Sequence, residues 1–245
     1  MKKVLLAVLG RGCMMDGLEG PWVSTEDFDW WKLGVSRPNV ITVPPDTDEN
    51  CVIGGGKLQI DAAKALYREL QPVMTVFAYG NRSPYLKAHD YPSESEVMTG
   101  DFVNEVTEEM GIPPCVDTFD EDEWNAAGSS SYQEVHNLLS LALRLGVDEV
   151  VFLTIQVHMN RVLVMLTKHL KDPAFASLRT KVRFEITESV LLRTDAEKYA
   201  ERVLAIFGSQ AFLRNLEREL NGSRAMYAGV TQTKQVAQAA EAPSK

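Results

Sequence analysis

The sequence predicts an α/β protein: a Rossmann-like three-layer sandwich built around a mostly parallel sheet. Short apolar runs alternate with longer segments of helical periodicity along most of the chain, and this alternation is typical of parallel sheets with helices on both faces. The composition agrees, because the 245 residues are 45% hydrophobic and 24% charged, as in ordinary globular proteins.

In the first half of the chain, the predicted elements follow one another at short intervals. Strands are expected at residues 3–9, 73–78 and 115–119, and helices at 58–70 and 93–110. The first strand is a continuous apolar run, which indicates burial on both faces. In the second helix, Ser93 and Glu96 have the spacing of a capping box, and Gly111 follows its end.

The second half continues the alternation. Strands are expected at 149–154 and 181–187, and helices at 129–145, 157–170, 195–207 and 210–220. The clearest strand is the Val-Val-Phe-Leu run that lies between Asp148 and Thr154.

We expect one domain over residues 1–228, followed by a disordered tail at 229–245 that is rich in Gln, Ala and Lys. An aromatic-rich insertion at about 13–56 carries Trp22, Trp30 and Trp31. Long loops in compact domains often serve as lids or binding loops. The alternative is an insertion that packs its aromatic side chains on the core.

Composition also excludes several classes of function. The formal net charge is −9 and no long run of Lys or Arg occurs, which argues against nucleic acid as a main partner. No stretch approaches the length of a membrane span. Cys13, Cys51 and Cys115 are far apart, which argues against a disulfide framework and a cysteine-based zinc site. We therefore expect a cytoplasmic protein with buried thiols and without a metal.

Three loops follow predicted strands and should meet at the carboxyl edge of the sheet. They contain Gly10, Arg11 and Gly12; Gly80 and Arg82; and Thr154, His158 and Arg161. Glycine-rich turns and helix N-termini present backbone N–H groups to anions, and arginine binds phosphate or carboxylate through two donors. The sequence thus predicts an anion site, although neither a complete dinucleotide motif nor a Walker loop is present.

His158 is the strongest candidate for a general acid or base, and Arg161 lies three residues later on the same expected helix face. The alternative is a structural histidine. Ser131 and Glu96 are candidate catalytic partners, and Ser130 and Glu134 are candidate ligand contacts. N-capping is a simpler explanation for one of the two serines, and capping or the helix dipole is a simpler explanation for Glu96.

Four blocks together resemble the YdcF/SanA/ElyC-like family, a family of domains of unknown function. The blocks are Val8-Leu9-Gly10-Arg11-Gly12; Phe77 to Arg82 with Ser95-Glu96-Val97-Met98; Gly111-Ile112-Pro113 with Ser130 to Val135; and Thr154 to Arg161. The last block is the most specific, because the family has Thr-Ser-x-x-His-Met-x-Arg there.

The resemblance implies a Rossmann-like fold and a pocket formed by these blocks. It also implies S-adenosylmethionine as a candidate ligand. Membrane-anchored members of the family are associated with envelope maintenance, and because no membrane anchor is expected here, the chain looks like the soluble branch. We therefore expect a transferase or hydrolase that binds a small anionic or nucleotide-like molecule. The alternative is a non-catalytic ligand-binding module, or an interaction protein that uses the tryptophans at 22, 30 and 31. The sequence does not predict the oligomeric state.

Overall fold

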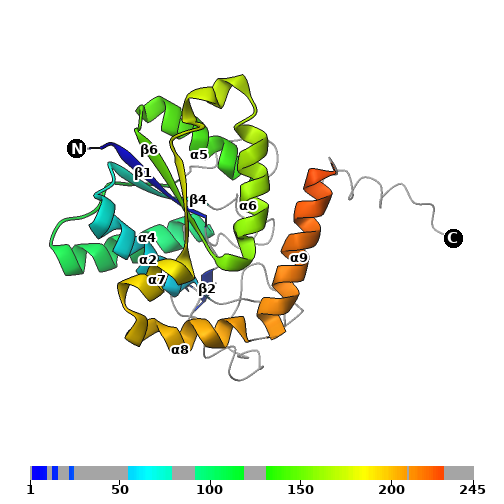
Figure 1. Cartoon of the computed structure of the whole chain (residues 1–245). Helices are drawn as coiled ribbons and strands as arrows, with labels where there is room; N and C mark the ends of the chain where they lie inside the picture. Colours follow the sequence, from blue (N-terminus) through cyan, green and yellow to red (C-terminus); the bar gives the residue numbers. More distant parts are fainter. Residues whose placement is uncertain are drawn as a thin grey trace.

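The computed structural model describes residues 2–9, 13–15, 22–24, 55–78, 92–118, 131–208 and 210–228. Its centre is a five-stranded sheet in the order β5-β4-β1-β6-β7, in which every neighbouring pair is parallel (Figure 1). The strands are β1 (Val4–Leu9), β4 (Met74–Ala78), β5 (Val116–Thr118), β6 (Glu149–Thr154) and β7 (Val182–Ile186). The predicted fold class is confirmed.

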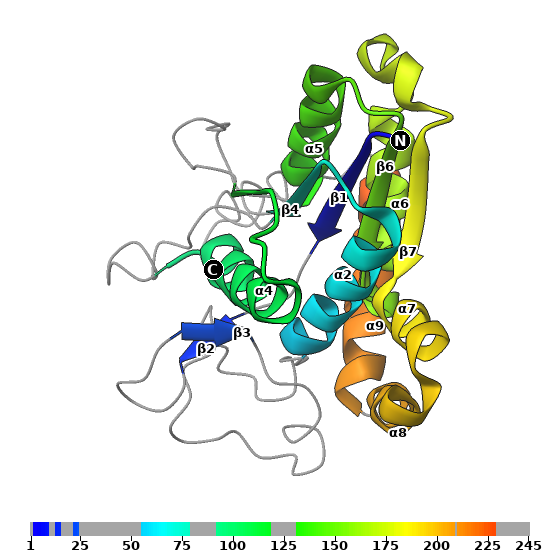
Figure 2. The same ribbon diagram turned by 90° about the vertical axis from the view of Figure 1, so that its left-hand side faces the viewer.

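Helices cover both faces of this sheet (Figure 2). The helices are α2 (Gly56–Leu70), α4 (Glu94–Met110), α5 (Ser131–Leu145), α6 (Gln156–His169), α7 (Thr187–Thr194), α8 (Ala196–Phe207) and α9 (Gln210–Tyr227), with a 3-10 helix η1 (Pro173–Leu178). Buried side chains of α2, α4 and α7 form one core cluster with the sheet, and those of α5, α6 and η1 form the other. α9 packs along α6.

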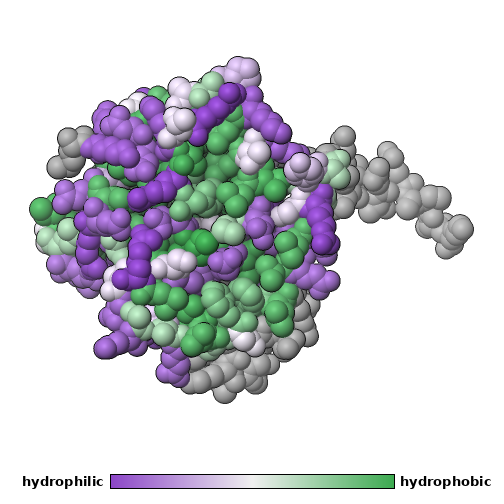
Figure 3. Space-filling model, viewed as in Figure 1, coloured by the Kyte–Doolittle hydropathy of each residue, from purple (hydrophilic) through white to green (hydrophobic). Residues whose placement is uncertain are grey.

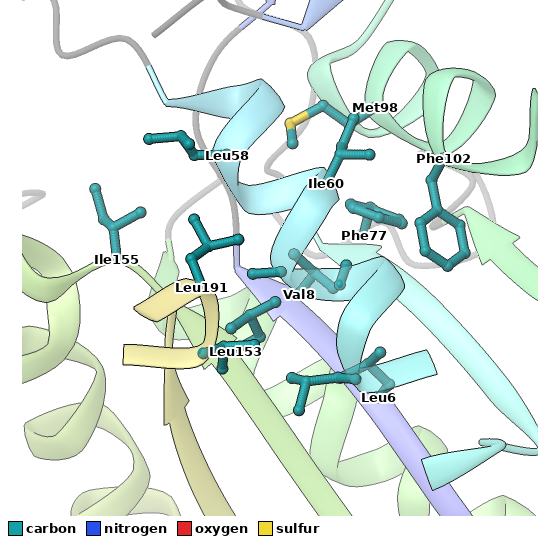
Figure 4. Packing of buried hydrophobic residues seen from close by; sticks show 14 of the residues in the cluster. Leu6, Val8, Leu58, Ile60, Phe77, Met98, Phe102, Leu153, Ile155 and Leu191 are labelled. Atoms are coloured by element: carbon teal, nitrogen blue, oxygen red, sulfur yellow. The ribbon is translucent and has the colours of Figure 1, made fainter. Parts of the chain in front are cut away.

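Alternate residues of β1 point into the two core layers. Leu6 and Val8 join the layer under α2 and α4, which Figure 4 shows from close by, whereas Leu5 and Ala7 join the layer under α5 and α6. Every residue of β1 is buried, which explains why its sequence is continuously apolar rather than alternating.

The strand order reverses direction between β1 and β6. The chain runs outward from β1 through β4 to β5, then returns to the other side of β1 to form β6 and β7. The helices that follow β1 and β6 therefore lie on opposite faces, with α2 in one core layer and α6 in the other. A crevice at the carboxyl ends of the strands is expected at such a point.

Most differences from the sequence prediction lie at element ends. α9 continues to Tyr227 rather than ending at residue 220, and the short helix α7 was not predicted. α7 was missed because it begins directly at Thr187, with no glycine or proline to mark the end of β7.

The expected insertion contributes a two-stranded antiparallel hairpin, β2 (Cys13–Met15) and β3 (Trp22–Ser24). It contacts α4, where the Ser24 N–H donates to Asp101 Oδ2 at 2.8 Å. Residues 16–21 and 25–54 of the insertion, including Trp30 and Trp31, and the tail at 229–245 lie outside the described residues.

Among the described residues, no helix combines the length and apolar character that a membrane crossing requires. Figure 3 shows that polar and apolar residues are mixed over the face seen in Figure 1, with apolar residues gathered over α8 and the start of α9. Leu204, Phe207 and Leu213 are the exposed large apolar side chains in that area.

Candidate functional site

The last carbonyl of β1 is held by side chains from two neighbouring elements. Gln59 Nε2 of α2 donates to the Leu9 carbonyl oxygen at 2.6 Å, and Thr154 Oγ1 at the end of β6 lies 3.4 Å from the same oxygen. Gln59 and Thr154 are both fully buried. The point at which the chain leaves β1 toward Gly10 is therefore fixed by contacts between α2 and β6.

The ends of three neighbouring strands lie level at this edge. Leu9 pairs with Ala78 of β4, and Val8 pairs with Leu153 of β6. The loops that follow these strands start side by side, as the sequence predicts. Five of the predicted ligand residues in or near them lie outside the described residues, namely Gly10, Arg11, Gly12, Gly80 and Arg82, and so does Ser130.

The first turn of α6 is capped by a residue that the sequence analysis missed. The N-cap residue Ile155 has no side-chain cap, and the Gln156 N–H donates instead to Glu188 Oε2 of α7 at 3.0 Å. Glu188 is only 6% exposed. Its carboxylate is stabilised by the positive end of the helix dipole, so α7 holds the start of α6 in place. No sequence pattern links these two segments.

His158 and Arg161 share one partner, Glu219 of α9. His158 Nδ1 lies 3.0 Å from Glu219 Oε2, and Arg161 Nη1 lies 3.5 Å from Glu219 Oε1. The three side chains are 15–18% exposed. The structure thus brings the two predicted site residues together on one face of α6, and this face is directed toward α9.

This arrangement orients the imidazole. A carboxylate at Nδ1 favours the tautomer in which Nδ1 carries the proton and Nε2 carries the lone pair. Nε2 is then the ring nitrogen that could accept a proton from a ligand. The Nε of Arg161 is buried and has no hydrogen-bond partner among the described residues.

Glu96 lies in the first turn of α4 and completes the predicted capping box. Its Oε2 accepts from the Ser93 N–H at 2.6 Å, and its own N–H donates to Ser93 Oγ at 3.1 Å. The capping prediction is confirmed, and the carboxylate is engaged in the cap. Nearby, Ser95 Oγ donates to the Phe77 carbonyl at 2.6 Å and fixes α4 to the end of β4.

Ser131 and Glu134 lie in the first turn of α5, which packs against α6. Both side chains are half-buried. A glutamate in this turn is favoured by the helix dipole. The Tyr132 carbonyl in the same turn lies 2.9 Å from Nε2 of His169, the last residue of α6. This turn therefore lies beside the end of α6, about three turns of helix away from His158, so the structure does not bring Ser131 and Glu134 together with His158.

A small cavity opens beside the start of α6, on the α2 side of the sheet. It is lined by Gly55, Leu58, Ile155, Val157, Thr187, Glu188, Ile206 and Phe212. Figure 4 shows Leu58 and Ile155 beside one another at the margin of the core cluster. The lining is largely apolar, and Thr187 Oγ1 is buried without a hydrogen-bond partner among the described residues. The accessible volume of the cavity is about 10 Å³, which is room for no more than about one water-sized group.

The remaining candidates for chemistry lie elsewhere. His169 is buried against Tyr132, whose carbonyl lies 2.9 Å from His169 Nε2, and burial lowers the pKa of this histidine. No group of three or more His, Cys, Asp or Glu in the described part of the chain has a metal-binding arrangement. Cys115 is exposed, so the expectation of a buried thiol is wrong at this position, which directly precedes the edge strand β5.

Comparison of the chain with protein-family models, with curated proteins and with solved structures finds no match. The resemblance to the YdcF/SanA/ElyC-like family therefore rests on the sequence blocks alone and stays a prediction.

Proposed function

We propose that the protein binds a small anionic or nucleotide-like ligand at the carboxyl edge of its sheet and acts on it as a transferase or hydrolase. One observation carries this proposal: β1 and β6 are neighbours whose following helices cover opposite faces of the sheet. In doubly wound sheets, ligands bind outside the carboxyl ends of the strands at this reversal.

Three arginines would supply the positive charge in an otherwise acidic protein. Arg11 and Arg82 follow β1 and β4 in the sequence, and Arg161 lies in the second turn of α6. A guanidinium group binds phosphate or carboxylate through paired donors. S-adenosylmethionine is the candidate that the family resemblance suggests, and its carboxylate would suit such a site.

His158 would accept a proton from the bound ligand at Nε2, and Glu219 would fix the orientation of the ring. A non-catalytic ligand-binding protein is the second candidate. This candidate is favoured because Glu96, one of the predicted catalytic residues, uses its carboxylate to cap α4. We also infer a cytoplasmic location from the wide spacing of the cysteines.

Ligand binding tests the proposal. A thermal-shift and calorimetric panel would contain S-adenosylmethionine, nucleoside phosphates and sugar phosphates. A ligand at 100 times its dissociation constant should stabilise the wild-type protein by about 2.7 kcal/mol. Arg11→Ala and Arg82→Ala should abolish the effect. Arg144→Ala, at the far end of α5, is the matched control and should retain it. Equal binding by all three variants, or no stabilisation by any ligand, would contradict the proposed site.

Turnover separates the two candidate functions. His158→Gln should abolish conversion of a bound ligand and leave binding in place, whereas His136→Gln on α5 should leave both unchanged. A ligand that binds tightly to the wild-type protein without conversion on prolonged incubation would favour the non-catalytic candidate.

A further inference from the structure

The strand β7 forms one margin of the sheet. All five of its residues are half-exposed, in contrast with the fully buried β1. The strand lies at the right-hand margin of Figure 2, and the same margin faces the viewer in Figure 1. Within the described part of the chain, no strand pairs with its outer edge.

The hydrogen bonds to β6 show which backbone groups of β7 point outward. The Val150 N–H donates to the Lys181 carbonyl at 2.8 Å, and Val150 pairs with Val182. In a parallel ladder, alternate residues direct both backbone groups toward the same neighbour. Arg183 and Glu185 therefore bond to β6, while Val182, Phe184 and Ile186 present their N–H and C=O groups to the outer edge.

The sequence of β7, Val-Arg-Phe-Glu-Ile, is complementary to itself when reversed. In an antiparallel pair centred on Phe184, Phe184 meets Phe184 of the second copy and Val182 meets Ile186. These are the residues whose backbone groups point outward. Arg183 then lies opposite Glu185, at the position in an antiparallel pair where facing side chains are closest. Opposite charges placed there stabilise the pair.

Within one chain, Arg183 is incompletely bonded. Its Nε lies 3.8 Å from Glu149 Oε1 and 3.7 Å from Glu185 Oε1. Both contacts are longer than a good hydrogen bond, and Nε and Nη2 have no hydrogen-bond partner among the described residues. These two nitrogens are buried, so a carboxylate from a second copy would meet the exposed part of the Arg183 side chain, which is 35% exposed.

We infer that two copies of the chain associate through β7 into a two-fold symmetric dimer with one continuous sheet. A two-fold interface uses the same surface on both copies, so it requires the self-complementarity that β7 has. Charges on an edge strand usually prevent pairing. In this register each Arg183 meets Glu185 of the other copy, and Glu185 would then be shared with Arg193 of its own chain, whose Nη1 donates to Glu185 Oε2 at 2.6 Å. The apolar residues Val182, Phe184 and Ile186 meet on the other face of the sheet.

The solution mass and a proline substitution test this inference. Light scattering and sedimentation of the full-length protein should give twice the chain mass of 27.3 kDa, with a concentration-dependent equilibrium. Val182→Pro removes an outward donor and leaves the β6 ladder intact, because the Val182 N–H is not used there. This variant should be monomeric. Val182→Ala keeps the N–H and is the matched control, so it should remain dimeric.

A second variant tests the charge pairing independently. Arg183→Ala removes both cross-strand ion pairs and should weaken dimerisation roughly 2- to 30-fold. Circular dichroism establishes that each variant is folded. If Val182→Pro fails to fold, Arg183→Ala decides. A wild-type protein that stays monomeric at every concentration, or a dimerisation constant that Arg183→Ala leaves unchanged, would overturn the inference.

Discussion

Replacing Gln59 by leucine tests whether the contact at the end of β1 stabilises the fold. The substitution removes the donor to the Leu9 carbonyl and nearly preserves side-chain volume. Among the described residues, the side-chain contact that the carbonyl then keeps is that with Thr154 Oγ1 at 3.4 Å, at the limit of a hydrogen bond. A buried acceptor left poorly bonded costs about 1–3 kcal/mol. We expect a loss of about 2 kcal/mol, which corresponds to about 4–8 °C in melting temperature for a chain of this size.

Urea unfolding followed by circular dichroism measures this loss. Gln133→Leu is the matched control, because Gln133 Nε2 donates to Asn137 Oδ1 at 2.9 Å within α5. The control should change stability by less than about 0.5 kcal/mol. The reasoning is refuted if the two variants are equally stable, since the Leu9 carbonyl would then gain nothing from Gln59.

Two further variants test the core and the pH dependence. Phe102→Ala should cost about 3–5 kcal/mol in chemical denaturation, because this fully buried ring lies 5.8 Å from Tyr67 and 5.2 Å from Phe77, centroid to centroid; a loss below about 1 kcal/mol would contradict that packing. Burial lowers the pKa of His169 from its ordinary value of 6.5, so the unfolded chain binds the proton more readily and stability should decrease as the pH falls below 6.5 toward the lowered value. His169→Gln should remove this part of the pH dependence, and an unchanged slope between pH 7 and about pH 5 would show that His169 does not contribute.

The sequence predicts those features that depend on neighbouring residues. Each strand of the sheet was predicted within two residues at either end. β1 and β6 are buried on both faces and contain continuous apolar runs, whereas the half-exposed β7 alternates apolar and charged residues. The capping box of Ser93 and Glu96 was predicted because both groups lie in one turn of helix. The start of α7 at Thr187 was missed because threonine is β-branched and favours strands. The sequence therefore gives no sign that β7 ends before it.

The candidate site was predicted only in part, because its electrostatics depend on tertiary contacts. The three-residue spacing of His158 and Arg161 places them on one face of α6, which the sequence does show. It does not show which carboxylate meets that face. Glu219 and Glu188 reach α6 from helices far along the chain, and no periodicity connects such segments.

The position of Glu219 leads to a last prediction about anion binding. Its carboxylate lies 3.5 Å from Arg161 Nη1, so an anionic ligand at this arginine must compete with it. Glu219→Gln removes the negative charge and keeps the size, and should tighten binding of a nucleoside triphosphate about fivefold. Glu217→Gln makes the same change at an exposed position of α9 and should leave affinity unchanged. Weaker binding in Glu219→Gln would mean that Glu219 orients Arg161 for the ligand. An affinity equal to that of the control would place the ligand away from Arg161, at the loops that follow β1 and β4.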